Sequence, residues 1–361
     1  MPLIWCSISG HGFGHAAQVA PVLNELGKSV SGIKALLRTT LPRQFFEGFI
    51  QIPWELTRQQ QDVGCVQEGP LHIDHDATWA ETQRFHDQWE TRVEEETRAI
   101  LARSPAMLLS NISHLAVEAG ARAGLPTIAM SSLSWDQILE PLMTPGDIRQ
   151  AGVLQQIKQA YSHADLLIRV TPGMPFPAFP NQIDIAPIVR PLVSDRARLN
   201  EELVAQPDDC LVLIGFGGIA LNRLPFSRLN ALQGYRFIVG ESVPSGYSRL
   251  RSAKSLPLSF DTLMASADMI VTKPGYNMTV EAVAMGKPTL YVRRYDFAEE
   301  EYLVQFLHQY GRALQLSMQD FEAGHWGSSL DTLRALPAPL QVPPSPTGAA
   351  EAAEILASYL R

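Results

Sequence analysis

The chain has 361 residues, of which 46% are hydrophobic and 18% are charged, and its formal net charge is −8. This composition predicts a well-buried globular protein long enough for two α/β domains, and it excludes a disordered chain. The acidic balance argues against general nucleic-acid binding, because proteins of that class rely on basic surfaces.

No segment of the chain carries a membrane-targeting pattern. Residues 3–8 are apolar but follow no basic segment, so we expect no signal peptide. No apolar run reaches the roughly 18 residues of a spanning helix. Cys6, Cys65 and Cys210 are scattered without a zinc spacing, which indicates buried thiols in a reducing compartment. We therefore expect a cytoplasmic protein without a transmembrane segment.

The first predicted strand covers residues 3–8 and leads into a loop rich in glycine and histidine. Gly12 and Gly14 allow a tight turn and a close approach of a ligand to the backbone. A histidine in a solvent-facing loop has no core to fill, so His15 or His11 is a candidate general base, since imidazole titrates near neutrality. A structural role for both is the alternative. A helix follows, with apolar residues at helical spacing at Val19, Val22, Leu23 and Leu26.

Residues 39–43 predict the end of a second strand, and residues 45–78 form a less regular region. This region contains the run His-Ile-Asp-His-Asp at 72–76, which has the ligand types of a metal site but no established metal spacing. An acceptor-binding loop or a solvated turn is the preferred interpretation.

The longest helical pattern covers residues 77–102, where the charges at 90–98 indicate a solvated face. Residues 106–109, 115–123 and 126–130 then predict a strand, a helix and a strand. This unit places Asp136 just beyond the carboxyl end of a strand, where open α/β sheets bind ligands. Asp136 is a second candidate for the base or for a group that orients the acceptor. A helix N-cap is its alternative role.

The middle of the chain predicts a domain boundary. The proline-rich residues 171–180 are typical of a surface loop, residues 183–189 of a last strand, and residues 190–207 of a linker. A second series begins with an apolar run at 210–214 and a Gly-Phe-Gly-Gly turn that includes Gly217 and Gly218. Further strands are expected at 235–239, 255–258 and 268–272.

The most informative stretch begins at Lys273. A strand ends there at a Pro-Gly pair, a helix covers 276–285, and residues 289–292 form another strand. The free N–H groups at such a helix start can bind a phosphate. Asn277 and Thr279 can add side-chain donors, and Glu281 lies one turn further in, where a carboxylate could accept from ribose hydroxyls. An ordinary strand–turn–helix connection is the alternative.

This stretch resembles the donor signature of GT-B glycosyltransferases, in which a Gly-x-Asn-x-Thr-x-x-Glu-like run holds the diphosphate and ribose of a nucleotide sugar. The Gly-rich loop at 10–15 is similar to the acceptor-side loop of the same enzymes, and the turn at 217–218 to the loop that faces the diphosphate. In that family an acidic residue and a Gln read the sugar; here Glu299 and Glu300 stand at this place. The residues that the resemblance assigns to the donor are Gly12, Gly14, Gly217, Gly218, Lys273, Gly275, Asn277, Thr279, Glu281, Arg293, Glu299 and Glu300.

Several motifs also follow one another as in the glycosyltransferase-like N-terminal region of the plant L-arabinokinases. They are Ser-Gly-His-Gly-Phe-Gly-His at 9–15, Asp-Val-Gly-Cys-Val-Gln at 62–67, Ser-Trp-Asp at 134–136, Lys-Pro-Gly-Tyr at 273–276 and Val-Arg-Arg at 292–294. The Pro-x-Gly-x-Gly-Ser-Ser loop of their sugar-kinase domain has no true counterpart here. We therefore expect no kinase activity.

The resemblance implies the GT-B architecture, with two Rossmann-like α/β domains facing a cleft and a C-terminal helix that returns to the first domain. We assign residues 1–190 and the helix at 349–361 to an acceptor-side domain and residues 208–336 to a donor domain. The implied function is transfer of a hexosyl or pentosyl group from a UDP- or dTDP-linked sugar to an unknown acceptor. No cofactor or metal is expected, since Lys273 or Arg293 can neutralise the leaving diphosphate. A UDP-sugar 2-epimerase and a non-catalytic nucleotide-sugar-binding regulatory module are the alternatives.

Overall fold

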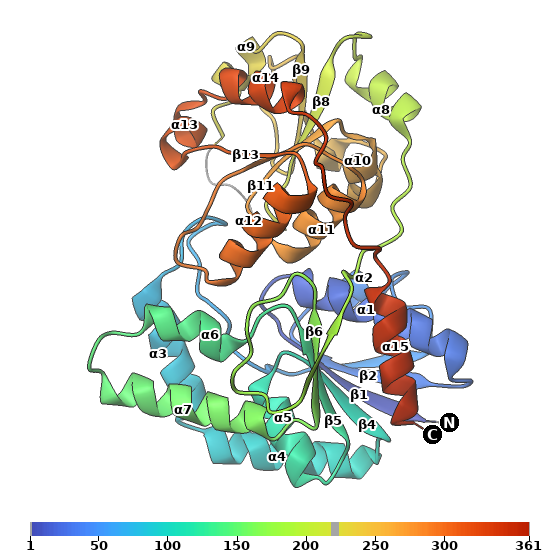
Figure 1. Ribbon diagram of the computed structural model, residues 1–361, viewed down its shortest axis with the longest axis vertical. Coiled ribbons are helices and arrows are strands. Elements are labelled where there is room, and N and C mark those ends of the chain that lie inside the picture. The colour runs from blue at the N-terminus through green and yellow to red at the C-terminus, as the bar shows by residue number, and fades with distance from the viewer. Residues whose placement is uncertain (1, 218–223, 361) are drawn as a thin grey trace.

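A computed structural model describes residues 2–217 and 224–360, which form two α/β units, one above the other in Figure 1. The described residues of the first unit contain a seven-stranded parallel sheet with the order β3-β2-β1-β4-β5-β6-β7. Its central strands are apolar runs buried between helices, as parallel sheets require, whereas the edge strands β3 and β7 are more exposed. Their bounds are β1 Leu3–Ile8, β2 Lys34–Thr39, β3 Trp54–Arg58, β4 Met107–Asn111, β5 Thr127–Ser131, β6 Leu166–Val170 and β7 Gln182–Ile185.

In the second unit, the described residues contain a six-stranded parallel sheet with the order β10-β9-β8-β11-β12-β13. Both sheets reverse their strand order beside their first strand, between β1 and β4 and between β8 and β11. Ligands of open parallel sheets bind outside the carboxyl ends of the strands at such a reversal. The bounds are β8 Cys210–Ile214, β9 Tyr235–Val239, β10 Leu250–Ser252, β11 Met269–Thr272, β12 Thr289–Tyr291 and β13 Ala313–Gln315.

Helices cover both sheets (Figure 1). Those of the first unit are α1 Gly14–Ser29, α2 Arg43–Phe46, α3 His75–His86, α4 Trp89–Arg103, α5 His114–Arg122, α6 Trp135–Leu139 and α7 Ile148–Ser162, with a 3₁₀ turn η1 at Glu140–Leu142. Those of the second unit are α8 Arg196–Leu203, α9 Phe226–Ala231, α10 Phe260–Ser266, α11 Tyr276–Ala284, α12 Glu299–Tyr310, α13 Met318–Ala323 and α14 Gly327–Ala335, with η2 at Ala253–Ser255.

The last helix, α15 Gly348–Ser358, crosses back and packs against α1 of the first unit (Figure 1). Its buried face consists of small and apolar side chains, which allow close approach: Ala352, Ala353, Leu356 and Ala357. Gly348 lies so close to the chain after β7 that a Cβ there would be 2.0 Å from the carbonyl oxygen of Ala186. The predicted fold, with two Rossmann-like units and a returning C-terminal helix, is confirmed.

The two units share one apolar cluster. Tyr276, Val280 and Leu303 of the second unit belong to the same buried cluster as Ala16 and Val19 of α1. Polar contacts add to this packing, since the Tyr276 hydroxyl donates to the Thr171 carbonyl at 2.9 Å and accepts from the Ile188 N–H at 3.0 Å. The described surfaces of the units are therefore docked on each other.

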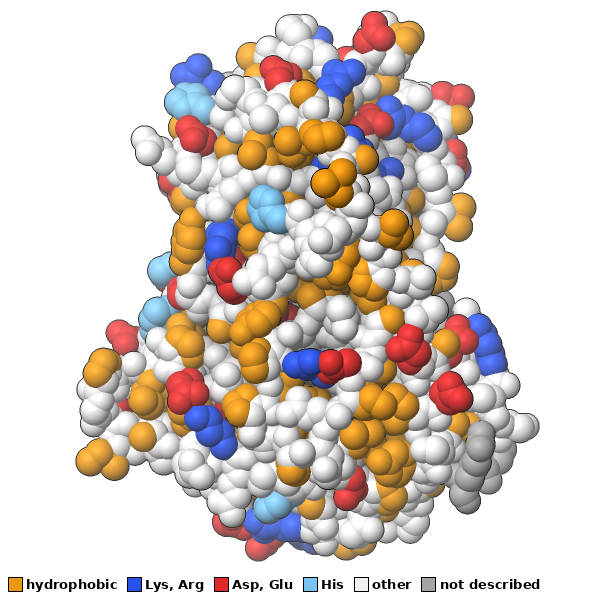
Figure 2. All heavy atoms as spheres, viewed as in Figure 1, with side chains coloured by type: hydrophobic (Ala, Val, Ile, Leu, Met, Phe, Trp, Pro, Cys, Tyr) orange, Lys and Arg blue, Asp and Glu red, His pale blue; other side chains and the backbone are white. Residues whose placement is uncertain are grey.

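The surface carries mixed charge. On the face that Figure 2 shows, Lys and Arg side chains are scattered among Asp and Glu, and no extended basic patch forms there. The view agrees with the acidic composition of the chain.

The helix predicted at 77–102 is in fact two helices, α3 and α4, separated at Asp87. The break lets His86 and Trp89 turn toward the same neighbour, since their rings stack on each other with 5.0 Å between centroids and both stack on His114 of α5. This gain in buried ring contact outweighs the continuous helical propensity of the sequence.

Three further local predictions are wrong. The segment 171–180 is not a surface loop, because Met174, Phe176 and Phe179 are each 2% exposed and pack in the core with α7 residues. Residues 255–258 form no strand; the strand at that place is β10, and its successor is the turn η2. The linker after Arg190 contains the helix α8, whose Leu199 and Leu203 are buried. In the proline-rich segment and in α8, apolar side chains are buried by contacts with residues distant in the sequence, which the local pattern does not show.

Candidate functional site

The candidate site lies where the carboxyl ends of β1, β4 and β5 face those of β8, β11 and β12. Two contacts join the predicted motifs across this boundary. The Asn277 side chain donates to the Gly14 carbonyl at 3.2 Å, and the Ser132 hydroxyl donates to the Glu299 carboxylate at 2.7 Å. The structure therefore brings the histidine loop and the donor motif together, although they are far apart in the sequence.

We expected His15 to face solvent, and this prediction is wrong. His15 lies in the first turn of α1 with 7% of its surface exposed. Its Nδ1 is 2.7 Å from the Asn111 Oδ1 atom. A carbonyl oxygen can only accept, so Nδ1 carries the proton of the neutral ring and Nε2 keeps its lone pair. Burial lowers the pKa of His15 to about 4, although the hydrogen bond that its ring donates to Asn111 acts to raise it. At neutral pH this ring is therefore a base in the correct tautomer.

His11 has the opposite tautomer. The backbone N–H of Cys65 donates to its Nδ1 at 3.3 Å, so the proton of the neutral ring is on Nε2. Burial, followed by the positive fields of His15, Lys273 and Arg294, lowers the pKa of His11 to about 3. His11 therefore offers a neutral N–H donor, which suits contact with an anionic oxygen better than proton removal.

Asp62, which sequence reasoning noticed only as part of a motif, fixes the histidine loop. It accepts from the Ser9 hydroxyl and from the Trp135 indole, each at 2.9 Å, and it is 4% exposed. Burial raises the pKa of Asp62 to about 6, against the pull of these donors. Gly64 follows at φ +72°, and a Cβ there would lie 2.6 Å from the His11 ring. The sequence signal for this contact is Gly64, which follows two residues after Asp62 and allows the chain to approach the His11 ring.

Asp136 lies on α6 and is fully buried. Its carboxylate accepts from the Ser134 hydroxyl at 2.5 Å and from the Gln137 side chain at 3.2 Å. The N-cap of α6 is Ser134, so the alternative role of Asp136 as the cap is wrong. Asp136 stays a candidate of second rank, since both of its carboxylate oxygens already accept local hydrogen bonds.

On the donor side, Lys273 lies beside the glycine turn. Its Cε atom is 3.9 Å from the position that a Cβ on Gly217 would take, and its side chain is 9% exposed. Burial, aided by Arg294 and opposed by Glu300 and Glu299, lowers the pKa of Lys273 to about 7. The neighbouring Gly218 lies outside the described residues. A buried lysine beside a glycine turn with φ +72° at Gly217 is suited to an anionic group.

The start of α11 has unused donor capacity. Gly275 is its N-cap and provides no side chain for its first N–H groups. The Thr279 hydroxyl is fully buried and has no hydrogen-bond partner among the described residues. Such a group costs roughly 1–3 kcal/mol unless a ligand satisfies it.

Other predicted donor residues are already paired with arginines. Both oxygens of Glu281, which is 1% exposed, accept from Arg190, at 2.7 and 3.1 Å. Arg190 also holds Asp261 of α10, at 2.9 Å. A ribose at Glu281 would therefore share these oxygens with Arg190, since a carboxylate has about four acceptor sites.

Glu300 is fully buried and accepts from the Arg294 side chain at 2.6 Å, whereas Arg293 donates to the exposed Glu301 at 3.0 Å. Glu299 instead accepts from the Ser132 hydroxyl, and burial raises its pKa to about 7, although Ser132 and the charge of Arg294 act to lower it.

The metal-like run at 72–76 is used in the fold. Asp74 caps α3 by accepting from the Ala77 N–H at 2.8 Å, and His75 contacts Asp296 of the second unit at 3.0 Å. Within residues 2–217 and 224–360, no group of three or more His, Cys, Asp or Glu side chains could hold a metal ion.

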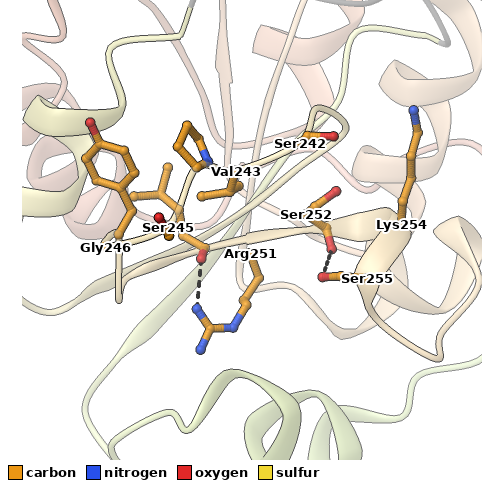
Figure 3. Close-up of a pocket in the computed structure, with 11 residues that line it drawn as sticks. Ser242, Val243, Ser245, Gly246, Arg251, Ser252, Lys254 and Ser255 are labelled. Carbon is orange, nitrogen blue, oxygen red and sulfur yellow. Dashed lines mark hydrogen bonds between the residues drawn. The ribbon is translucent and has the colours of Figure 1, made fainter.

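A pocket of about 470 Å³ lies at the carboxyl ends of β9 and β10, on one side of the strand reversal. Figure 3 shows Ser242, Ser252, Lys254 and Ser255 around it, with Arg251 on the far side of the strand. Hydroxyl groups and a lysine line part of its wall, and apolar side chains such as Val243, Pro244 and Leu250 line the rest. Its place on the second sheet is two strands away from the glycine turn.

Comparisons with known proteins agree with this geometry. No protein-family model matches the chain. The chain is 27% identical over 338 residues to the L-arabinokinase of Arabidopsis thaliana, which covers 90% of the chain but only 31% of that relative's length. The match is therefore confined to part of that protein.

Solved structures show the fold. The calicheamicin glycosyltransferase CalG4 matches 99% of the chain with a TM-score of 0.66 at 15% identity and 98% of its own length. A UDP-glucosyltransferase from Polygonum tinctorium matches 99% of the chain with a TM-score of 0.64 at 15% identity and 98% of its own length. MurG from Acinetobacter baumannii matches 99% of the chain and 100% of its own length, at a TM-score of 0.54 and 12% identity. The chain thus has the GT-B architecture. Among the described residues, no helix is long and apolar enough to span a membrane.

Proposed function

We propose that this protein is a glycosyltransferase that moves a sugar from a nucleotide-sugar donor to an acceptor nucleophile. The observation that carries the proposal is His15. It is buried in its base tautomer on the first unit, opposite a phosphate-binding type of helix start on the second unit. The GT-B architecture of the neighbours supports the same reaction class.

In this mechanism the second unit holds the donor. The Gly217 turn, the N–H groups at the start of α11 and the Thr279 hydroxyl bind the diphosphate, and Lys273 adds positive charge. His11 is close enough to Lys273 and Arg294 for their charges to lower its pKa, so we assign its neutral Nε2–H donor to the same anionic group. These groups stabilise the negative charge that develops on the leaving group, without a metal ion.

The first unit activates the acceptor. His15 Nε2 removes the proton of the acceptor hydroxyl, while Asn111 holds the ring through Nδ1. Asn111 is neutral and stabilises the imidazolium less than a carboxylate would. The base is therefore weak but stays deprotonated well below neutral pH.

The pocket beside β9 and β10 is suited to the nucleobase. A nucleotide with its diphosphate at the Gly217 turn would reach this pocket across two strands, about 10 Å at the usual strand spacing. The hydroxyls of Ser242 and Ser252 can pair with the edge of a uracil or thymine, and the Ser255 hydroxyl, which donates to the Ser252 carbonyl at 2.7 Å, can still accept. A UDP- or dTDP-linked hexose or pentose is the donor class that we propose.

A non-catalytic nucleotide-sugar-binding module is the second candidate. Arg190 occupies both oxygens of Glu281, so the ribose ligand of an active enzyme is internally paired in this structure. A module that responds to a nucleotide sugar could use the release of Arg190 as its signal.

A panel of UDP- and dTDP-sugars separates these functions. A transferase releases nucleoside diphosphate only with an acceptor, an epimerase changes the sugar without release, and a binding module does neither although calorimetry detects the nucleotide sugar. His15→Gln is the matched control, since it keeps the bulk of the side chain but removes the base. Turnover that survives in His15→Gln would remove His15 from the mechanism.

A further inference from the structure

Five buried polar side chains form one unbroken chain of hydrogen bonds across the boundary between the two units. His15 contacts Asn111 at 2.7 Å, Asn111 contacts Gln18 at 3.0 Å, Gln18 contacts Ser132 at 3.1 Å, and Ser132 contacts Glu299 at 2.7 Å. The first four residues belong to the first unit and Glu299 belongs to α12 of the second. All five are at most 7% exposed. Water therefore competes little for these groups.

The carboxylate at the end of the chain fixes the direction of every bond in it. An ionised carboxylate only accepts, so the Ser132 hydroxyl must donate to Glu299. The Ser132 oxygen can then only accept from Gln18, which turns the Gln18 carbonyl toward the Asn111 amide N–H. The Asn111 carbonyl is left to face His15 Nδ1. The position of the His15 proton thus depends on a carboxylate four hydrogen bonds away.

If these hydrogen bonds ran in the opposite direction, the His15 ring could not act as a base. If Asn111 turned its amide N–H toward His15, Nδ1 would accept and the proton of the neutral ring would move to Nε2. That tautomer has no lone pair for the acceptor hydroxyl. Two of the links are carboxamides, which do not pass protons readily, so the chain orients the base and does not conduct its proton.

We propose that docking of the second unit selects the base tautomer of His15, through Glu299 and the positioning residues Ser132, Gln18 and Asn111. When the units separate, Ser132 loses its acceptor and both carboxamides are free to turn. The base is therefore completed only in the docked arrangement, in which water is also excluded from the reacting groups. This inference rests on the proposed function of His15 as the base.

Nuclear magnetic resonance of the imidazole nitrogens tests the inference without turnover. The full chain, labelled with ¹⁵N-histidine, is measured at pH 8, where Glu299 is ionised. Wild type is expected to show His15 with its proton on Nδ1. Ser132→Ala is expected to give a mixture of both tautomers, and Ser132→Thr, which keeps the hydroxyl, is expected to restore the single tautomer. Ser110→Ala is the matched control, because the Ser110 hydroxyl is buried and donates to the Ser113 carbonyl, which is not part of the hydrogen-bond chain.

A double substitution sharpens the test. In Asn111→Asp the group next to His15 is itself acceptor-only, so the tautomer no longer depends on Ser132. Adding Ser132→Ala to this variant is expected to leave the His15 signal unchanged. If Ser132→Ala does not fold, Glu299→Gln replaces it. The new amide can donate to Ser132, so the hydrogen bonds between Glu299 and His15 are no longer held in one direction.

Kinetics give the second readout. Ser132→Ala is expected to lower kcat about 3- to 10-fold, in proportion to the lost base tautomer, with donor affinity unchanged within twofold. A single Nδ1–H tautomer in both Ser132→Ala and Glu299→Gln would overturn the inference. Absence of turnover in wild type, with the tautomer responding as expected, would instead overturn the proposed function and leave the hydrogen-bond chain established.

Discussion

The substitution Asn111→Asp should move the pH dependence of the reaction by a predictable amount. Asn111 Oδ1 is 2.7 Å from His15 Nδ1, so the change places a negative charge in direct contact with the ring. His15 now has a pKa lowered to about 4 by burial. An opposite charge at this range raises such a pKa by roughly 1–3 units, which corresponds to about 1.4–4 kcal/mol of added stabilisation of the imidazolium.

The assay is the pH dependence of kcat/KM with an identified donor and acceptor. Since a general base works only when deprotonated, the main loss of wild-type activity should fall near pH 4. A smaller loss of about 3- to 10-fold is expected earlier, near pH 7, where protonation of Glu299 no longer fixes the tautomer of His15. In Asn111→Asp the acid limb should lie roughly between pH 5 and 7. Asn24→Asp is the matched control, because Asn24 is partly buried and pairs with the Phe49 carbonyl away from the site. An unchanged acid limb in Asn111→Asp, or complete loss of wild-type activity already near pH 6.5, would refute the assignment of His15 as a base held by Asn111.

Four other outcomes are expected. His15→Ala should lower the transfer rate by a factor of about 10²–10⁴ with donor affinity nearly intact, whereas His11→Ala should mainly weaken donor binding; equal rates in both variants would contradict the two tautomers. Thr279→Ala should weaken nucleotide-sugar binding by about 1–3 kcal/mol in calorimetry, and wild-type affinity in that variant would remove α11 from the donor site. EDTA should leave turnover unchanged; a loss that Mg²⁺ or Mn²⁺ restores would show that the basic groups do not suffice. His114→Gln should reduce the loss of stability in acid. Burial lowers the pKa of His114 well below 6.5, so its contribution to the free energy of unfolding is present above pH 6.5 and is lost as the pH falls, by about 1.4 kcal/mol per pH unit. Urea unfolding at pH 7.5 and 5.5 measures this loss in both proteins. Equal losses in both proteins would refute this role.

The sequence predicts the alternation of strands and helices well, because buried parallel strands are short apolar runs between glycine turns. β9 lies at the predicted residues 235–239, and α11 begins at Tyr276 as the Pro-Gly pair indicates. β3 and β13 escape prediction because they are edge strands of their sheets, and half-exposed strands lack a continuous apolar run.

The polar contacts of the site are less predictable, because they join residues far apart in the sequence. Asn111 and Gln18 are ordinary polar residues in a strand and a helix, and nothing local shows that they face His15. Arg190 was assigned to a linker, and its contact with Glu281 spans 91 positions. Motifs therefore indicate a candidate site, whereas the pairing of its charged side chains is visible only in the fold.

The return of α15 to the first unit has a consequence for synthesis. β1 and α1 leave the ribosome before the second unit does, but the face of α1 that α15 covers stays unprotected until α15 itself has emerged. The second unit, in contrast, is contiguous and can complete its sheet before α15 appears. The unit that begins first in translation is therefore the one that finishes last. A ribosome that stalls within the segment before α15 would expose an apolar helix surface to chaperones and proteases.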